Sequence, residues 1–252
     1  MTAHLMNTHP HRPGAPPLVL VAHGSRDPRA LATVTALADR VRALRPGLPV
    51  HLGHIELNEP LLPDTLAALG DGREAVLVPL LLSRGYHIKQ DIPEMAAASP
   101  ARTRLAAPLG PHPLLAEALA TRLTEAGWTR GDAVVLAAAG SRDPEAAVDT
   151  GHMARLLSTR LGGAPVVPAY ASAAKPTVPE AVRALRSRGH GRVAIASYFT
   201  APGRFATECA AAVPDLAAAP LGTHPAMARL ILHRYDQARR TAPLKRALAT
   251  TP

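Results

Sequence analysis

LVLVAHGSRDPRA, at residues 18–30, returns as VVLAAAGSRDPEA at residues 134–146, and this repeated stretch decides the fold. Each copy begins with an apolar run and continues into an amphipathic segment, a pattern that predicts a buried strand followed by a helix. The shared GSRDP turn suits that change, because glycine allows a sharp bend, aspartate caps helices and proline is favourable at a first helical position. The copies differ before the turn, where His23 is replaced by Ala139.

Further stretches recur along the chain in the same order. EPLLPDTLAAL at 59–69 matches KPTVPEAVRAL at 175–185, VLVPLLLSRG at 76–85 matches AIASYFTAPG at 194–203, and APLGPHP at 107–113 matches APLGTHP at 219–225. Shared order and spacing indicate a tandem duplication. We predict an N-terminal lobe at 17–128 and a C-terminal lobe at 129–240, with a flexible leader at 1–16 and a flexible tail at 241–252.

Within each lobe, short apolar runs alternate with longer amphipathic segments. The strands that we expect are 18–24, 49–57, 75–83 and 104–110 in the first lobe, and 133–140, 165–172, 192–200 and 216–222 in the second. The helices that we expect in the first lobe are 28–44, 60–70, 91–99 and 113–123. Strands that are apolar throughout are typical of parallel sheets covered on both faces. The sequence therefore predicts an α/β fold of two doubly wound, parallel-sheet lobes that face each other across a cleft.

Composition narrows the class of protein. The single cysteine, Cys209, excludes an intramolecular disulfide, and no apolar run approaches the roughly 18 residues that cross a bilayer. We expect a cytoplasmic protein that does not bind membranes. The formal net charge of +9 comes mostly from scattered arginines without an aromatic platform, which argues against a nucleic-acid partner. The surplus fits either solvated helix faces or attraction of an anionic small molecule.

Potential metal ligands follow the strands of the first lobe. His23 ends the first predicted strand, Glu56 ends the second and His87 follows the third. Ligands of open α/β sheets bind outside the carboxyl ends of the strands, so these side chains are expected at one edge. Taken singly, each also fits a polar residue of a turn. His54 shares a strand face with Glu56 but lies farther inside, where a core histidine is the better interpretation.

The duplication provides an internal control for these candidates. The repeat partners of the three side chains are Ala139, Ser172 and Phe205, so the second lobe lacks every one of them. Gly24, Ser25, Arg26, Asp27 and Pro28 have identical partners instead, which favours a structural role in the turn. His112 and His224 are also paired, and we expect them to begin helices. The lobes thus differ in the residues that carry chemistry.

Two imidazoles and a carboxylate suit borderline divalent metals such as iron, cobalt, nickel or zinc better than magnesium or calcium. Other chemistries lack support in the sequence. No G-x-S-x-G stretch is present for a serine hydrolase, and no G-x-x-x-x-G-K stretch for a phosphate-binding loop. GSRDP resembles such a loop only loosely.

At these residues the sequence resembles the sirohydrochlorin chelatases, which are small class II tetrapyrrole chelatases that insert cobalt or ferrous iron. The matching phrases are LVAHGSRDPRA, IELNEPLLPDTL, VPLLLSRGYHIKQDIP and APLGPHP in the first lobe, and YFTAPGRF and APLGTHP in the second. The two-lobed chain is similar to the long, fused members, whose short relatives build one active site from two identical subunits. Cobalt would imply cobalamin synthesis, and iron would imply sirohaem synthesis.

The resemblance implies a sirohydrochlorin pocket between the lobes, with His23 and His87 as the catalytic, metal-handling residues and Glu56 as the accompanying carboxylate. It implies no cofactor beyond the substrate metal, Co²⁺ or Fe²⁺. Because sirohydrochlorin carries many carboxylates, cations of the loops are candidates to bind it. The candidate substrate-binding residues are Ser25, Arg26, Arg84, Lys89 and Arg204.

Other functions stay open at this point. The same fold could serve a non-catalytic carrier of tetrapyrrole or metal, although the complete set of candidates in one lobe argues for catalysis. A two-lobed binding protein for a different anion is the second alternative. The physiological metal is open as well, and a fused chain is expected to be a monomer or a weak homodimer.

Overall fold

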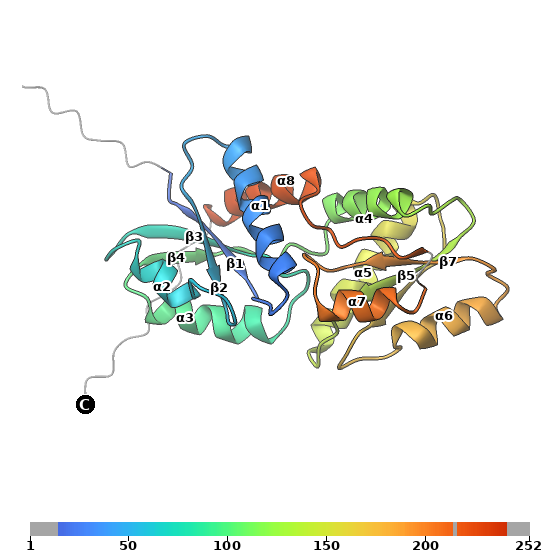
Figure 1. Cartoon of the computed structure of the whole chain (residues 1–252). Coiled ribbons are helices and arrows are strands. Elements are labelled where there is room, and N and C mark those ends of the chain that lie inside the picture. Colours follow the sequence, from blue (N-terminus) through green and yellow to red (C-terminus); the bar gives the residue numbers. More distant parts are fainter. Residues whose placement is uncertain (1–14, 214–215, 241–252) are drawn as a thin grey trace, which may run out of the picture.

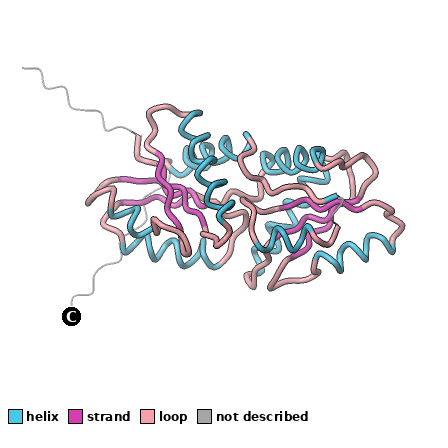
Figure 2. Tube along the Cα trace, in the orientation of Figure 1, coloured by secondary structure: helices cyan, strands magenta, loops and turns pink. Residues whose placement is uncertain are grey.

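The computed structural model describes residues 15–213 and 216–240, in which two parallel sheets lie side by side, each flanked by helices (Figures 1 and 2). This arrangement confirms the predicted α/β class and the two lobes. Apart from residues 15 and 16, the predicted leader lies outside the described residues, and so does the predicted tail. Within the described ranges, no helix has the length and apolar character needed to cross a membrane.

The sheet of the first lobe has four parallel strands in the order β2-β1-β3-β4. The strands are β1 Leu18–Ala22, β2 Val50–His54, β3 Glu74–Pro79 and β4 Arg102–Leu105. Strand β1 is buried throughout, as its unbroken apolar sequence predicts. The chain leaves β1 to one side for β2 and then crosses to β3 on the other side. This reversal creates a crevice at the carboxyl ends of β1 and β3, which is where ligands of such sheets bind.

The described part of the second sheet has three parallel strands in the order β6-β5-β7. These are β5 Ala133–Ala138, β6 Val166–Tyr170 and β7 Val193–Ser197. The fourth strand that we predicted at 216–222 is wrong: within the described residues, a single bridge joins Ala217 to Ile195. In the first lobe we predicted a strand at 104–110, but β4 begins at Arg102 and ends at Leu105. The strand ends before Pro108, which has no N–H to donate to a neighbouring strand.

Helices cover the sheets. They are α1 Pro28–Leu44, α2 Leu62–Ala67, a π-helical turn η1 His87–Asp91, α3 Ile92–Ala98, α4 Pro113–Glu125, α5 Pro144–Arg160, α6 Val178–Ser187, α7 Arg204–Ala210 and α8 Pro225–Ala238. The GSRDP turns begin helices as predicted. Asp27 accepts a hydrogen bond from the Arg29 amide at α1, and Asp143 accepts one from the Glu145 amide at α5, with proline at the first helical position of both.

The last helix of each repeat packs on the sheet of the other repeat. Helix α4 contacts α5 and β7, whereas α8 contacts α1 and β3 (Figure 1). Reciprocal hydrogen bonds fix this exchange: the Arg122 Nη2 donates to the Leu221 carbonyl over 3.4 Å, and the Arg234 Nη2 donates to the Leu109 carbonyl over 3.1 Å. The boundary at 128/129 stays a prediction, and the packing of α4 and α8 crosses it.

A histidine caps the N-terminus of both α4 and α8. The ring nitrogen of His112 accepts a hydrogen bond from the Leu114 amide, and that of His224 accepts one from the Ala226 amide. This confirms the structural role predicted for the pair. An imidazole can accept in this way only while it is neutral. Burial, with Arg234 and His233 nearby, lowers the pKa of His112 from 6.5 to about 4.

Acid is therefore expected to destabilise the fold through His112. Between pH 6.5 and about 4 the unfolded chain binds a proton at this residue that the folded chain does not, so the free energy of unfolding falls as the pH falls through that window. Thermal unfolding at about pH 7.5 and about pH 5 measures the effect. His112→Asn, which caps without titrating, should reduce the pH dependence of Tm. An equal pH dependence in both proteins would contradict this role.

Candidate active site

A cavity of about 1360 Å³ lies between the lobes. The first lobe lines it with residues 22–27 and 80–88, and the second lobe with residues 138–141 and 198–208. All of these segments follow the carboxyl ends of strands. The cleft predicted between the lobes is therefore present, and it lies where the crossover between β1 and β3 places ligands.

His23 and Glu56 meet at the end of the first two strands. Their side chains are 3.5 Å apart, from Nδ1 to Oε1, and both are about half exposed. The backbone enforces this approach, because the Glu56 amide donates to the His23 carbonyl over 3.1 Å. Gly24 makes room for it: its φ is +102°, and an added Cβ would lie 1.8 Å from the Glu56 carbonyl oxygen. Any side chain at this position would separate the two segments.

His87 begins the turn η1 and faces His23. Their ring centroids are 4.6 Å apart and the ring planes are nearly perpendicular, at 88°. The Nδ1 of His87 lies 2.5 Å from Oδ2 of Asp91, one turn later. A carboxylate accepts, so Nδ1 carries the proton and Nε2 is left for a ligand. The sequence analysis missed Asp91, although its i, i+4 spacing from His87 was a usable signal.

The three predicted ligands contact one another in pairs rather than around one point. His23 contacts both Glu56 and His87. In the described part of the chain, no group of three or more His, Cys, Asp or Glu side chains is arranged to hold a metal ion. The common ligand set of these three residues stays a prediction. His54 is buried, as expected for a core histidine, with Nδ1 3.2 Å from the Pro60 carbonyl.

The second lobe has the same backbone geometry without the candidate ligands. The Ser172 amide donates to the Ala139 carbonyl, and an added Cβ on Gly140 would lie 1.8 Å from the Ser172 carbonyl oxygen. Phe205 lies at the start of α7, in the place that His87 has in the first lobe. The repeat partners were thus aligned correctly, and the lobes differ in side-chain chemistry rather than in turn geometry.

Four of the five predicted substrate-binding residues line the cavity, namely Ser25, Arg26, Arg84 and Arg204, whereas Lys89 lies outside its lining. The Ser25 hydroxyl accepts from the Asp27 amide, and its own amide donates to Asn58 Oδ1 over 2.7 Å, so it orders the turn. Within the described residues, Arg26 forms no ion pair. The side chain of Arg204 is 75% exposed, lies over the Phe205 ring and is 3.8 Å from a Glu208 oxygen. Their contact with a substrate stays a prediction.

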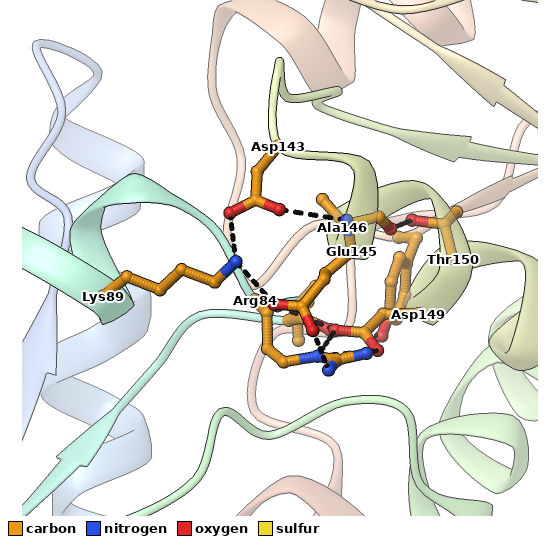
Figure 3. A network of polar contacts seen from close by, with 9 residues as sticks. Arg84, Lys89, Asp143, Glu145, Ala146, Asp149 and Thr150 are labelled. Atoms are coloured by element: carbon orange, nitrogen blue, oxygen red, sulfur yellow. Dashed lines mark hydrogen bonds and ion pairs between the residues drawn. The ribbon is translucent and has the colours of Figure 1, made fainter.

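Arg84 and Lys89 differ from Ser25, Arg26 and Arg204, because carboxylates of the second lobe already bind them (Figure 3). Arg84 pairs with Asp149 and Glu145, each over 2.7 Å. Lys89 pairs with Asp143 over 2.6 Å and with Glu145 over 2.5 Å. The hydrogen bond that Lys89 donates to Asp143, followed by the one that it donates to Glu145, raises the pKa of Lys89. Binding of a substrate carboxylate by either cation would first require breaking these ion pairs.

Comparison with known proteins gives the family. The CbiX family model matches residues 17–126 and again 133–238. The chain is 28% identical over 237 residues to the sirohydrochlorin ferrochelatase of Bacillus subtilis (strain 168), covering 87% of this chain and 90% of the relative. It is 35% identical over 80 residues to the sirohydrochlorin cobaltochelatase of Methanococcus maripaludis, a match that spans 31% of this chain and 56% of that relative.

A solved structure agrees on the fold. SirB from Bacillus subtilis with Fe³⁺ superposes with a TM-score of 0.72 at 24% identity, covering 88% of this chain and 95% of that chain. The two matches to the family model coincide with the two repeats and together cover most of the sequence. This chain therefore belongs to the CbiX family.

Proposed function

We propose that the protein is a sirohydrochlorin chelatase, which inserts a divalent metal, Co²⁺ or Fe²⁺, into sirohydrochlorin. The observation that carries this proposal is the pair His23 and His87, whose rings face each other 4.6 Å apart beside the interlobe cavity. At about 1360 Å³ the cavity exceeds the roughly 300–1,000 Å³ of ordinary small-molecule pockets, so it suits a large macrocycle. The names of the B. subtilis and M. maripaludis relatives support the same substrate.

The imidazoles would do the chemistry. Insertion of M²⁺ replaces water on the metal with ring nitrogens and releases two protons from those nitrogens. A neutral imidazole binds borderline metals, and its ordinary pKa of about 6.5 lets it accept a proton near neutral pH. Nε2 of His87 is available for this role because Asp91 occupies Nδ1. Glu56, beside His23, would offset the metal charge and pass protons to solvent.

Among the described residues, Arg26 forms no ion pair and Arg204 forms a long one of 3.8 Å with Glu208 of its own helix, so both cations suit an anionic substrate. Arg26 and Arg204 belong to different lobes and both line the cavity. Guanidinium groups bind carboxylates with paired hydrogen bonds. A ring with carboxylate side groups could therefore be bound by an arginine from each lobe. Arg84 and Lys89 are weaker candidates for this role, because protein carboxylates neutralise them.

A direct assay tests the proposed function. The purified protein is mixed with sirohydrochlorin and Co²⁺ or Fe²⁺, and the visible spectrum is followed against a control without protein. We expect insertion to accelerate, with the faster metal identifying the preference. A shifted spectrum of bound ligand with an unchanged insertion rate would favour a tetrapyrrole or metal carrier. No spectral change at all would favour a binding protein for a different anion.

Arg204→Glu tests whether Arg204 binds the substrate. Reversing the charge of this exposed side chain should raise KM for sirohydrochlorin by about tenfold and leave kcat within about threefold, because the contact acts equally on the bound substrate and the transition state. Steady-state kinetics measure both constants. Arg183→Glu, on the exposed face of α6, is the matched charge control and should leave KM unchanged. A fall in kcat at constant KM would contradict the binding role of Arg204.

Location and assembly are part of the proposal. We infer a cytoplasmic enzyme that acts as a monomer or weak homodimer, with no nucleic-acid or membrane partner. The duplicated lobes support the monomer, because one chain supplies both walls of the cavity. The substrate metal is the only metal required, and the site suits cobalt and iron alike. Selection between them then depends on metal supply, so the pathway is cobalamin or sirohaem synthesis accordingly.

A further inference from the structure

The segment that carries His87 is anchored across the boundary between the lobes. Asp149, on helix α5 of the second lobe, accepts a hydrogen bond from the backbone amide of Arg84 over 2.8 Å. It also accepts from the Arg84 guanidinium, from Nε over 3.0 Å and from Nη2 over 2.7 Å. The Asp149 side chain is only 6% exposed. A buried carboxylate with charged and backbone donors makes the strong kind of hydrogen bond, which fixes both backbone and side chain.

A second anchor lies on the other side of His87. Lys89 contacts Asp143 and Glu145 at the start of α5, and Figure 3 shows its ammonium between the two carboxylates. Arg84 precedes His87 by three residues and Lys89 follows it by two. The histidine is therefore held from both sides by the second lobe, although that lobe contributes no imidazole to the pair.

Among the described residues, the corresponding segment of the second lobe, around Phe205, has no such anchors. The repeat partner of Asp149 is Thr33, whose hydroxyl donates to the Arg29 carbonyl of its own helix. The partners of Arg84 and Lys89 are Pro202 and Thr207. Within the described residues, no ion pair joins the segment that carries Phe205 to helix α1. The anchors thus occur only with His87, as the candidate catalytic residues occur only in the first lobe.

We propose that Asp149 is a positioning residue, which acts through Arg84 to hold His87 opposite His23. This inference rests on the proposed chelatase activity and deepens it. Two imidazoles can bind one metal only at a set separation, and the π-helical turn that carries His87 follows a loop rather than a strand. Displacement of a reacting group by about 1 Å can cost about 100-fold in rate. The second lobe would thus contribute to catalysis through a carboxylate that contacts neither metal nor substrate.

Asp149→Asn removes the charge and the paired geometry with little change of volume. Hydrogen exchange, measured by mass spectrometry without substrate, should become faster in the peptide that spans Arg84 to Asp91 and stay unchanged in β1. Binding of Co²⁺ alone should weaken about 10- to 100-fold, the usual effect of losing a group that orients a metal ligand. The kcat for insertion should fall by a similar factor while KM for sirohydrochlorin changes less than about threefold.

Two further variants complete the test. Thr33→Ala, at the mirror position on α1, should leave all three measurements unchanged. Arg84→Met keeps the backbone bond to Asp149 and should give an intermediate loss of kcat. If Arg84 instead bound substrate, KM would rise in that variant. An unchanged exchange rate or an unchanged kcat in Asp149→Asn overturns the positioning role, whereas a wild-type protein that does not metallate sirohydrochlorin overturns the proposed function itself. If Asp149→Asn does not fold, Arg84→Met decides whether Arg84 positions His87, which lowers kcat when it is lost, or binds the substrate, which raises KM.

Discussion

Alanine in place of His87 should reduce metal insertion to the rate of the reaction without protein. The residue would supply both a metal ligand and a proton acceptor, and loss of a positioned acid–base group alone costs about 10²–10⁴ in rate. The side chain is 36% exposed and contacts Asp91, His23 and the exposed Tyr86, none of which belongs to the apolar core. Initial rates of cobalt and iron insertion, followed in the visible spectrum, measure the loss.

The matched control is His152→Ala, on the exposed face of α5 outside the cavity lining. It should insert metal at the wild-type rate. Circular dichroism and thermal unfolding of both variants should match the wild type, which separates a catalytic loss from a folding defect. Near-normal insertion by a folded His87→Ala protein would remove this histidine from the mechanism.

The second large effect is expected from Gly24→Ala, which should destabilise the protein by at least about 3 kcal/mol. A left-handed backbone costs an alanine about 1–2 kcal/mol. In addition, its Cβ would lie 1.8 Å from the Glu56 carbonyl oxygen, so the turn and the end of β2 must separate. For a chain of this size we expect Tm to fall by roughly 6–12 °C.

Two glycines serve as comparisons. Gly140→Ala meets the Ser172 carbonyl oxygen at the same 1.8 Å, so it should cost as much stability as Gly24→Ala. Gly47→Ala, with φ of +83° and nothing within 4 Å of the added Cβ, should cost only the backbone strain of about 1–2 kcal/mol. Denaturant unfolding measures the loss of unfolding free energy in all three glycine variants. Equal losses at Gly24 and Gly47 would show that the close approach to Glu56 does not matter.

Local signals of the sequence predicted much of the fold. The apolar run and the turn after it were enough to predict β1 and helix α1, which runs from Pro28 to Leu44 as expected. The duplication aligned Ala139 and Ser172 with His23 and Glu56, and backbone hydrogen bonds in both lobes support that alignment. These features depend on residues close in sequence or on neighbouring strands, where spacing carries most of the information.

Features that depend on how the lobes dock were not predictable from spacing. Arg84 and Lys89 looked like free cations for the substrate, because nothing in the sequence shows that α5 places carboxylates beside them. Asp149 lies in the middle of an amphipathic helix and carries no motif. Helices α4 and α8 both follow an APLG-x-HP stretch, so this local pattern does not reveal which sheet each one covers.

The crossing of α4 and α8 has a consequence for how the two repeats could diverge. Because each sheet is covered by a helix encoded in the other repeat, neither repeat can be deleted or cut away without exposing an apolar face of the one that stays. The second repeat can therefore lack a histidine and a glutamate at the partner positions, yet it must keep its fold.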